Sequence, residues 1–72
     1  MSYSICYEGG AGSYPVREVT LIDALDFMKE CLVSRKRCFL YNQTRTKQIG
    51  YVVPLTKGKW VFKIKLGEND ND

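Results

Sequence analysis

The 72-residue sequence contains no histidine. Histidine exchanges a proton near neutral pH more readily than other side chains, and it forms the Ser–His and Cys–His pairs of nucleophilic enzymes. Its absence excludes those catalytic pairs and zinc sites built from cysteine and histidine together. The acids Asp23, Asp26 and Glu30 have the spacing of a solvated helix face, with docking on a basic partner as the alternative. We therefore expect a protein that is not an enzyme.

Cysteine is scarce, with three residues in the chain: Cys6, Cys31 and Cys38. A structural zinc site needs four ligands, and no Cys-x-x-Cys is present. An odd number of cysteines is untypical of a small secreted protein held by disulfides, so we expect three reduced thiols in a reducing compartment. The alternative is a redox pair between Cys31 and Cys38, which requires their Cα atoms to lie within about 7 Å. Folding is expected to need neither a metal nor a cofactor.

Long apolar runs are also missing, since none approaches the roughly 20 residues of a membrane-spanning helix. Residues 1–4 have neither the basic nor the long apolar segment of a secretory signal peptide. With 44% apolar and 26% charged residues, the composition is that of a globular domain. We expect one domain over 1–67, located in the cytoplasm, and an acidic disordered tail over 68–72.

Acidic residues are absent from one long stretch of the chain. Residues 31–67 carry nine basic side chains and no acidic one, whereas residues 1–30 and 68–72 each have a formal charge of −3. The nine are Arg35, Lys36, Arg37, Arg45, Lys47, Lys57, Lys59, Lys63 and Lys65. Such asymmetry favours a negatively charged partner that binds these residues as one basic stripe. The alternative is a solvated surface whose lysines protect sheet edges from aggregation.

Alternating apolar and polar residues predict strands over 3–8, 16–19, 37–42, 48–53 and 59–66. The last has the clearest alternation, and Lys57-Gly58 before it favours a hairpin turn. Between the second and third strands, a period of 3.6 residues predicts a helix over 21–33 with Thr20 as its N-cap. The expected apolar helix face consists of Leu21, Ala24, Leu25, Met28 and Leu32, flanked by Phe27 and Cys31.

The predicted fold is α+β, a small antiparallel sheet of order β-(β)-α-β-β-β with the helix packed on one face. The sheet residues expected in the core are Ile5, Tyr51, Trp60, Phe62 and Ile64. In particular, Trp60 should be buried against Leu25 and Met28. The opposite face of the sheet would then carry the lysines of 59–66 into solvent.

Two further segments extend the candidate surface. Phe39, Tyr41 and Tyr51 can stack on bases where they are exposed, although Tyr51 is expected in the core. The loop over 42–48 mixes guanidinium, ammonium, hydroxyl and amide groups with no acid, which suits phosphate oxygens. The glycine-rich segment 9–13 lacks the spacing of known phosphate loops, so we expect a flexible connection, with backbone contact to a partner as the alternative.

Several short segments carry a likeness to a known class of protein. The chain has an N-terminal strand and then a short helix. After these come the pair Cys38-Phe39, which enters the next strand, and the final segment Gly58-Lys59-Trp60-Val61. In this element order the chain resembles small phage-encoded anti-CRISPR proteins that block type I-F surveillance complexes. The resemblance implies a compact viral β-sheet protein that occludes a nucleic-acid-binding groove on a large complex.

Two functions are therefore expected. The first is an inhibitor or regulator whose nine basic residues contact a protein or ribonucleoprotein complex of the host, such as a CRISPR effector, in the host cytoplasm. The alternative is direct, largely sequence-independent binding of DNA or RNA by a basic sheet face. The protein is expected to be a monomer or weak homodimer and to bind no membrane.

Overall fold

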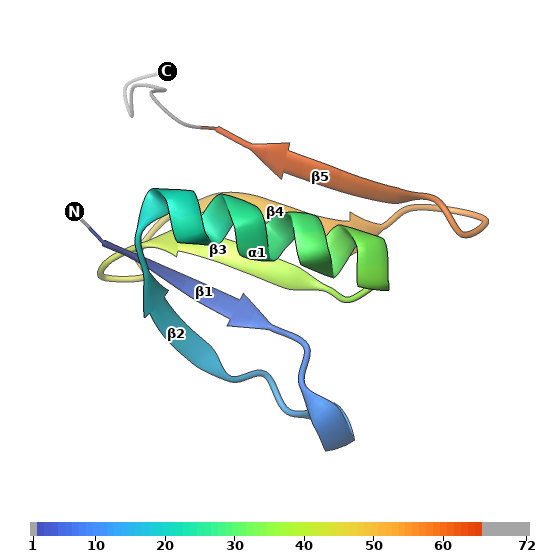
Figure 1. Cartoon of the computed structure of the whole chain (residues 1–72), viewed down its shortest axis with the longest axis horizontal. Helices are drawn as coiled ribbons and strands as arrows, with labels where there is room; N and C mark the ends of the chain where they lie inside the picture. Colours follow the sequence, from blue (N-terminus) through green and yellow to red (C-terminus); the bar gives the residue numbers. More distant parts are fainter. Residues whose placement is uncertain (1, 66–72) are drawn as a thin grey trace.

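The computed structural model describes residues 2–65. Its elements are β1 (Tyr3–Tyr7), the one-turn 3-10 helix η1 (Gly10–Gly12), β2 (Val16–Val19), α1 (Leu21–Ser34), β3 (Cys38–Asn42), β4 (Gln48–Pro54) and β5 (Trp60–Ile64). Figure 1 shows α1 lying across the sheet. The predicted α+β class and element order are thereby confirmed. The predicted tail over 68–72, like the end of the last predicted strand, lies outside the described residues.

The sheet has the strand order β2-β1-β3-β4-β5, and every neighbouring pair is antiparallel. Because β3 pairs with β1, the chain leaves the edge strand β2, crosses one face of the sheet as α1 and returns to its centre. The predicted hairpin turn between β4 and β5 is present, since Lys57 and Gly58 both have positive φ, 55° and 77°.

Local hydrogen bonds fix the two ends of α1. Thr20 Oγ1 accepts the N–H of Asp23 at 3.2 Å, which confirms the predicted N-cap. At the other end Arg35 adopts the left-handed conformation, with φ 60°, and terminates the helix one residue later than predicted. The guanidinium of Arg35 also donates to the carbonyl of Gly58 at 2.9 Å. The helix end is thus tied to the β4–β5 hairpin.

The core lies between α1 and one face of the sheet. Its buried apolar residues are Ile5, Val19, Ala24, Met28, Cys31, Cys38, Leu40 and Val52. The predicted apolar face of the helix is therefore correct for Ala24 and Met28 and wrong for Leu21 and Leu25, which are only partly buried and lie outside this cluster. Ala24 takes the central position at 0% exposure, because its small side chain lets the helix backbone approach the strands closely.

The prediction that Tyr51 belongs to the core is also wrong. In the register of the sheet, Val52 faces α1 together with its partners Cys38 and Phe62, so Tyr51 points to the other face. The register shifts between Leu40 and Tyr41, where β4 carries one extra residue. Trp60 does lie on the core face, but the prediction that it is buried against Leu25 and Met28 is wrong: it is only partly buried where it packs against the cluster, and Leu25 lies outside the cluster.

Candidate binding surface on the open face of the sheet

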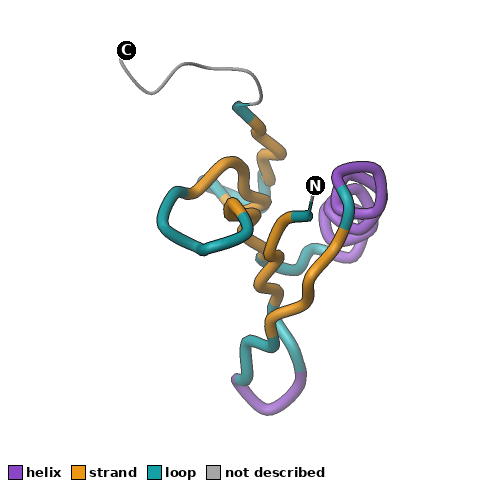
Figure 2. The backbone as a smooth tube through the Cα atoms, turned by 90° about the vertical axis from the view of Figure 1, so that its left-hand side faces the viewer, coloured by secondary structure: helices purple, strands orange, loops and turns teal. Residues whose placement is uncertain are grey.

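Within residues 2–65, no element covers the face of the sheet that points away from α1. Figure 2 shows α1 to one side of the strands, whereas a loop and no helix lies on the opposite side. We call this surface the open face. By register it carries Ser4, Cys6, Val16, Glu18, Phe39, Tyr41, Tyr51, Val53, Val61 and Lys63. A sheet with one helix normally needs apolar residues on one face only, so the aromatic residues here need another explanation.

One row of side chains crosses the middle of the open face. Cys6 pairs with Phe39, Phe39 with Tyr51, and Tyr51 with Lys63. Tyr41 lies two residues beyond Phe39 on β3 and therefore points to the same side. All three aromatic residues are half-buried by their neighbours in the sheet. Three aromatic side chains thus occupy neighbouring positions on one face, an aromatic patch with a lysine directly beside Tyr51.

Basic residues border this patch on the β5 side. Lys63 and Lys65 are exposed, and the backbone N–H of Lys65 donates to the carbonyl of Ile49 at 2.8 Å, which continues the pairing with β4. Tyr51 and both lysines line a shallow hollow of about 250 Å³. The hollow adjoins the extra residue of β4, where the strand departs from regular pairing.

The β3–β4 loop leans toward the open face. The side chain of Asn42 holds the loop, since its Oδ1 accepts the N–H groups of Thr46 at 2.9 Å and Lys47 at 3.2 Å. Ser4 Oγ donates to the carbonyl of Gln43 at 3.3 Å, and Gln43 Nε2 donates to Glu18 at 3.3 Å. Because Ser4 and Glu18 lie on the open face, these bonds anchor the loop on that side. The exposed Arg45 sits in the turn with φ 59°.

The structure divides the nine predicted basic residues between the two ends of the sheet. Four lie at the end where β3 meets β4: Arg45, Lys47, Lys63 and Lys65. The other five lie at the opposite end, around the α1–β3 junction and the β4–β5 hairpin: Arg35, Lys36, Arg37, Lys57 and Lys59. Of these five, Arg35 bonds the hairpin and Arg37 forms an ion pair with Glu8 at 3.7 Å. The predicted single stripe is therefore two groups.

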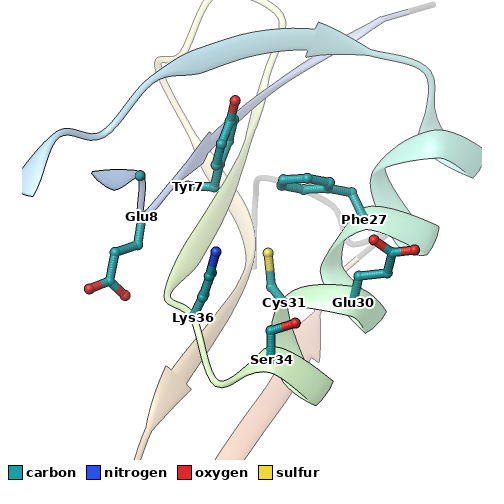
Figure 3. Close-up of a pocket in the computed structure, with 8 residues that line it drawn as sticks. Tyr7, Glu8, Phe27, Glu30, Cys31, Ser34 and Lys36 are labelled. Carbon is teal, nitrogen blue, oxygen red and sulfur yellow. The ribbon is translucent and has the colours of Figure 1, made fainter. Parts of the chain in front are cut away.

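A second hollow, of about 220 Å³, lies on the α1 side of the sheet. The rings of Tyr7 and Phe27 meet edge to face at its rim, with centroids 4.8 Å apart. Figure 3 shows the sulfur of Cys31 and the ammonium group of Lys36 pointing into it, while the carboxylate of Glu8 points away. The neighbouring glycine-rich loop is folded on itself, because Gly9 N–H donates to the Ser13 carbonyl. That bond leaves the loop poorly suited to cradle a phosphate.

All three cysteines are free thiols. Cys31 and Cys38 lie next to each other between α1 and β3, at 4% and 0% exposure. Burial raises the pKa of the Cys31 thiol, and it raises the pKa of the Cys38 thiol further, with the neighbouring Cys31 adding to the effect. A raised pKa suppresses the thiolate, so both behave as small apolar core residues.

Compared with protein-family models, curated proteins and solved structures, the chain matches none. The resemblance to anti-CRISPR proteins therefore stays a prediction. In residues 2–65, no group of three or more His, Cys, Asp or Glu side chains is placed to hold a metal ion. No helix in that part of the chain is long and apolar enough to cross a membrane.

Proposed function

We propose that the protein is a small non-enzymatic module that binds nucleic acid through the open face. One observation carries the proposal: Phe39, Tyr41 and Tyr51 lie together on the sheet face opposite α1, with Lys63 directly beside Tyr51. Aromatic rings interleaved with cations suit nucleic acids, since unpaired bases stack on rings and phosphates attract cations. The free thiols suit a reducing compartment such as the cytoplasm.

The distribution of charge around the open face supports phosphate binding on one side. Lys63 and Lys65 lie at the β4–β5 side, where the hollow opens, and Arg45 lies in the β3–β4 loop at the same end of the sheet. The acids Glu8 and Glu18 lie on the β1–β2 side, and both already accept hydrogen bonds: Glu8 from the N–H of Arg37, Glu18 from Ser2 and Gln43. A polyanion is therefore attracted to β4 and β5 and repelled from β2.

The test is a titration of fluorescently labelled DNA and RNA at two salt concentrations, followed by anisotropy. The site variant combines Arg45→Asn, Lys63→Ser and Lys65→Ser, because Asn tolerates the positive φ of residue 45. The control variant combines Lys29→Ser, Lys36→Ser and Lys57→Asn, which removes the same charge away from the open face.

The site variant should bind at least about tenfold more weakly, equivalent to about 1.4 kcal/mol. A plot of the logarithm of its binding constant against the logarithm of salt concentration should have a slope shallower by roughly one unit for each lost phosphate contact. The control variant should lose no more than about threefold in affinity, because only the long-range electrostatic attraction of the whole protein has changed. Equal loss in the two variants, with both folded by circular dichroism, would show that the open face is not the binding surface.

A second candidate function uses the same face to block a complex that handles nucleic acid. It is favoured by the apolar pair Val53 and Val61, which extends the aromatic patch toward the β4–β5 hairpin. Interfaces between proteins likewise concentrate aromatic residues and exclude charge at their centres. If this function holds, the protein binds no free nucleic acid but prevents a type I-F CRISPR effector from binding its target DNA in a gel-shift assay.

A further inference from the structure

We infer that the ligand of the open face is single-stranded nucleic acid, whose unpaired bases stack on Phe39, Tyr41 and Tyr51. This inference rests on the proposed nucleic-acid binding and specifies the class of nucleic acid. It is drawn from the arrangement of the three rings and from the breadth of the five-stranded sheet that carries them.

The rings are placed to accept separate bases. Phe39 and Tyr51 are direct partners on β3 and β4, and neighbouring strands lie about 4.8 Å apart. Tyr41 follows Phe39 on the same face, about 6.8 Å along the strand. Successive bases within one strand of a duplex lie 3.4 Å apart. A chain whose bases reach Phe39 and Tyr41 in turn must therefore be unstacked and extended.

A duplex cannot use these rings. The faces of its bases are covered by neighbouring base pairs, and a protein reaches only base edges in the grooves. The major groove admits an α-helix or a two-stranded ribbon, whereas the open face spans five strands and the helix lies on the far side. Stacking on a broad sheet therefore selects nucleic acid whose base faces are free.

The cations give the bound strand an expected path. A base on Tyr51 lies beside Lys63, its direct partner, and beside the hollow that Lys65 also lines. Phosphates on this side face ammonium groups, whereas phosphates over β2 would face Glu18. The sugar–phosphate backbone is thus expected along the β4–β5 side, with bases directed toward β3.

The experiment compares binding of labelled oligo(dT) and oligo(U), each about ten nucleotides long, with binding of a DNA hairpin duplex of similar size. The wild-type protein should bind both single strands at least tenfold more tightly than the duplex. The double variant Tyr41→Leu, Tyr51→Leu keeps apolar side chains and removes two rings. It should lose at least tenfold in affinity for the single strands.

Two further variants separate stacking from folding. The double variant Tyr41→Phe, Tyr51→Phe keeps both rings and should bind within about threefold of wild type. Val33→Ser removes an exposed apolar side chain from α1, on the other side of the sheet from the patch, and should also bind like wild type. Ultraviolet crosslinking of oligo(dT), read by mass spectrometry, should place crosslinks on β3 and β4.

The outcomes distinguish this inference from the function on which it rests. Equal affinity for duplex and single strand, with the leucine variant unchanged but the Arg45, Lys63 and Lys65 variant weakened, would overturn the single-strand inference and leave nucleic-acid binding in place. Failure to bind any nucleic acid at low salt would overturn both. A phenylalanine variant as weak as the leucine variant would show that the hydroxyl groups, and not the rings, hold the ligand.

Discussion

Substituting Gly50 by alanine should destabilise the hairpin that carries much of the open face. Gly50 pairs with Leu40 on one side and Ile64 on the other. A Cβ at this position would lie 2.7 Å from the backbone oxygen of Lys63 and 3.3 Å from the Cα of Ile64. These are backbone atoms of β5, so they cannot rotate away as a flexible side chain would. The strand itself must move.

The expected loss follows from that displacement. Inserting a methyl group into a tightly packed site costs about 1–3 kcal/mol, and a domain of this size has roughly 3–5 kcal/mol of stability in total. Gly50→Ala should therefore remove a large part of the free energy of unfolding. The pairing of Tyr51 with Lys63 should loosen with it, because the two residues belong to the same pair of strands.

Urea unfolding followed by tryptophan emission measures this effect. Trp60 is the single tryptophan and pairs with Pro54 in the same hairpin, so its emission reports on the strands concerned. With a slope of about 1 kcal/mol/M for a small domain, a loss of 2 kcal/mol lowers the urea midpoint by about 2 M.

Gly10→Ala is the matched control. No atom lies within 4 Å of a Cβ at Gly10, so the added methyl group meets open space. It should leave stability unchanged or raise it by up to about 1 kcal/mol, since alanine reduces the freedom of the unfolded chain. A Gly50→Ala protein with the midpoint of the Gly10→Ala protein would refute the close packing of β4 against β5.

Three further predictions concern the helix and the thiols. Thr20→Ala should lower the free energy of unfolding by about 1 kcal/mol, seen as a lower Tm, because the first turn of α1 loses its side-chain acceptor. A disulfide reagent at pH 8 should label Cys6 first and reach Cys31 and Cys38 only on unfolding, as both are buried with raised pKa values. Since the folded state holds these two thiols protonated, stability should be complete below the ordinary thiol pKa of 9.0 and fall as pH rises above it. Rapid labelling of all three thiols in the folded protein would contradict the buried positions.

The fold was predictable wherever one side of an element is apolar and the other polar. In β5, Trp60 and Phe62 alternate with Val61 and Lys63, and the predicted core face is correct. The N-cap was predictable because Thr20 forms a local bond that depends on three residues of sequence. Such signals depend on nearby residues only, and the tertiary packing of this fold agrees with them.

Prediction failed where both sides of a strand are apolar. In β4, Tyr51, Val52 and Val53 follow one another, so a period of two residues does not identify the buried side. The extra residue that shifts the register near Gln48 adds a second ambiguity, because it lets Ile49 pack against the core. The assignment of Tyr51 to the core rested on this ambiguous segment.

The types of residue on the candidate surface were predictable from the sequence, but their grouping in space was not. The basic stretch identifies Lys63 and Arg45 as candidates, but sequence distance does not say which basic residues lie at the same end of the sheet. Arg37 is the clearest case, because it is held by Glu8, a partner 29 positions away in the sequence. Long-range pairing of this kind leaves no local signal.

The aromatic patch is in excess of what the fold requires. A two-layer domain buries one face of its sheet, and here that face already has Ile5, Leu40 and Val52 at 0% exposure. The open face has small or polar residues on β1, namely Ser4 and Cys6, and aromatic rings on β3 and β4.

Folding alone would tolerate threonine or serine on the open face throughout, since polar side chains on the solvated face are the usual pattern in antiparallel sheets. When half-buried rings on this face are replaced by leucine, the protein should lose little stability but all of its stacking surface. The rings are thus costly for solubility and contribute to folding mainly through cross-strand pairs worth about 0.2–1 kcal/mol each, so stacking with a ligand is the larger contribution that we propose for them.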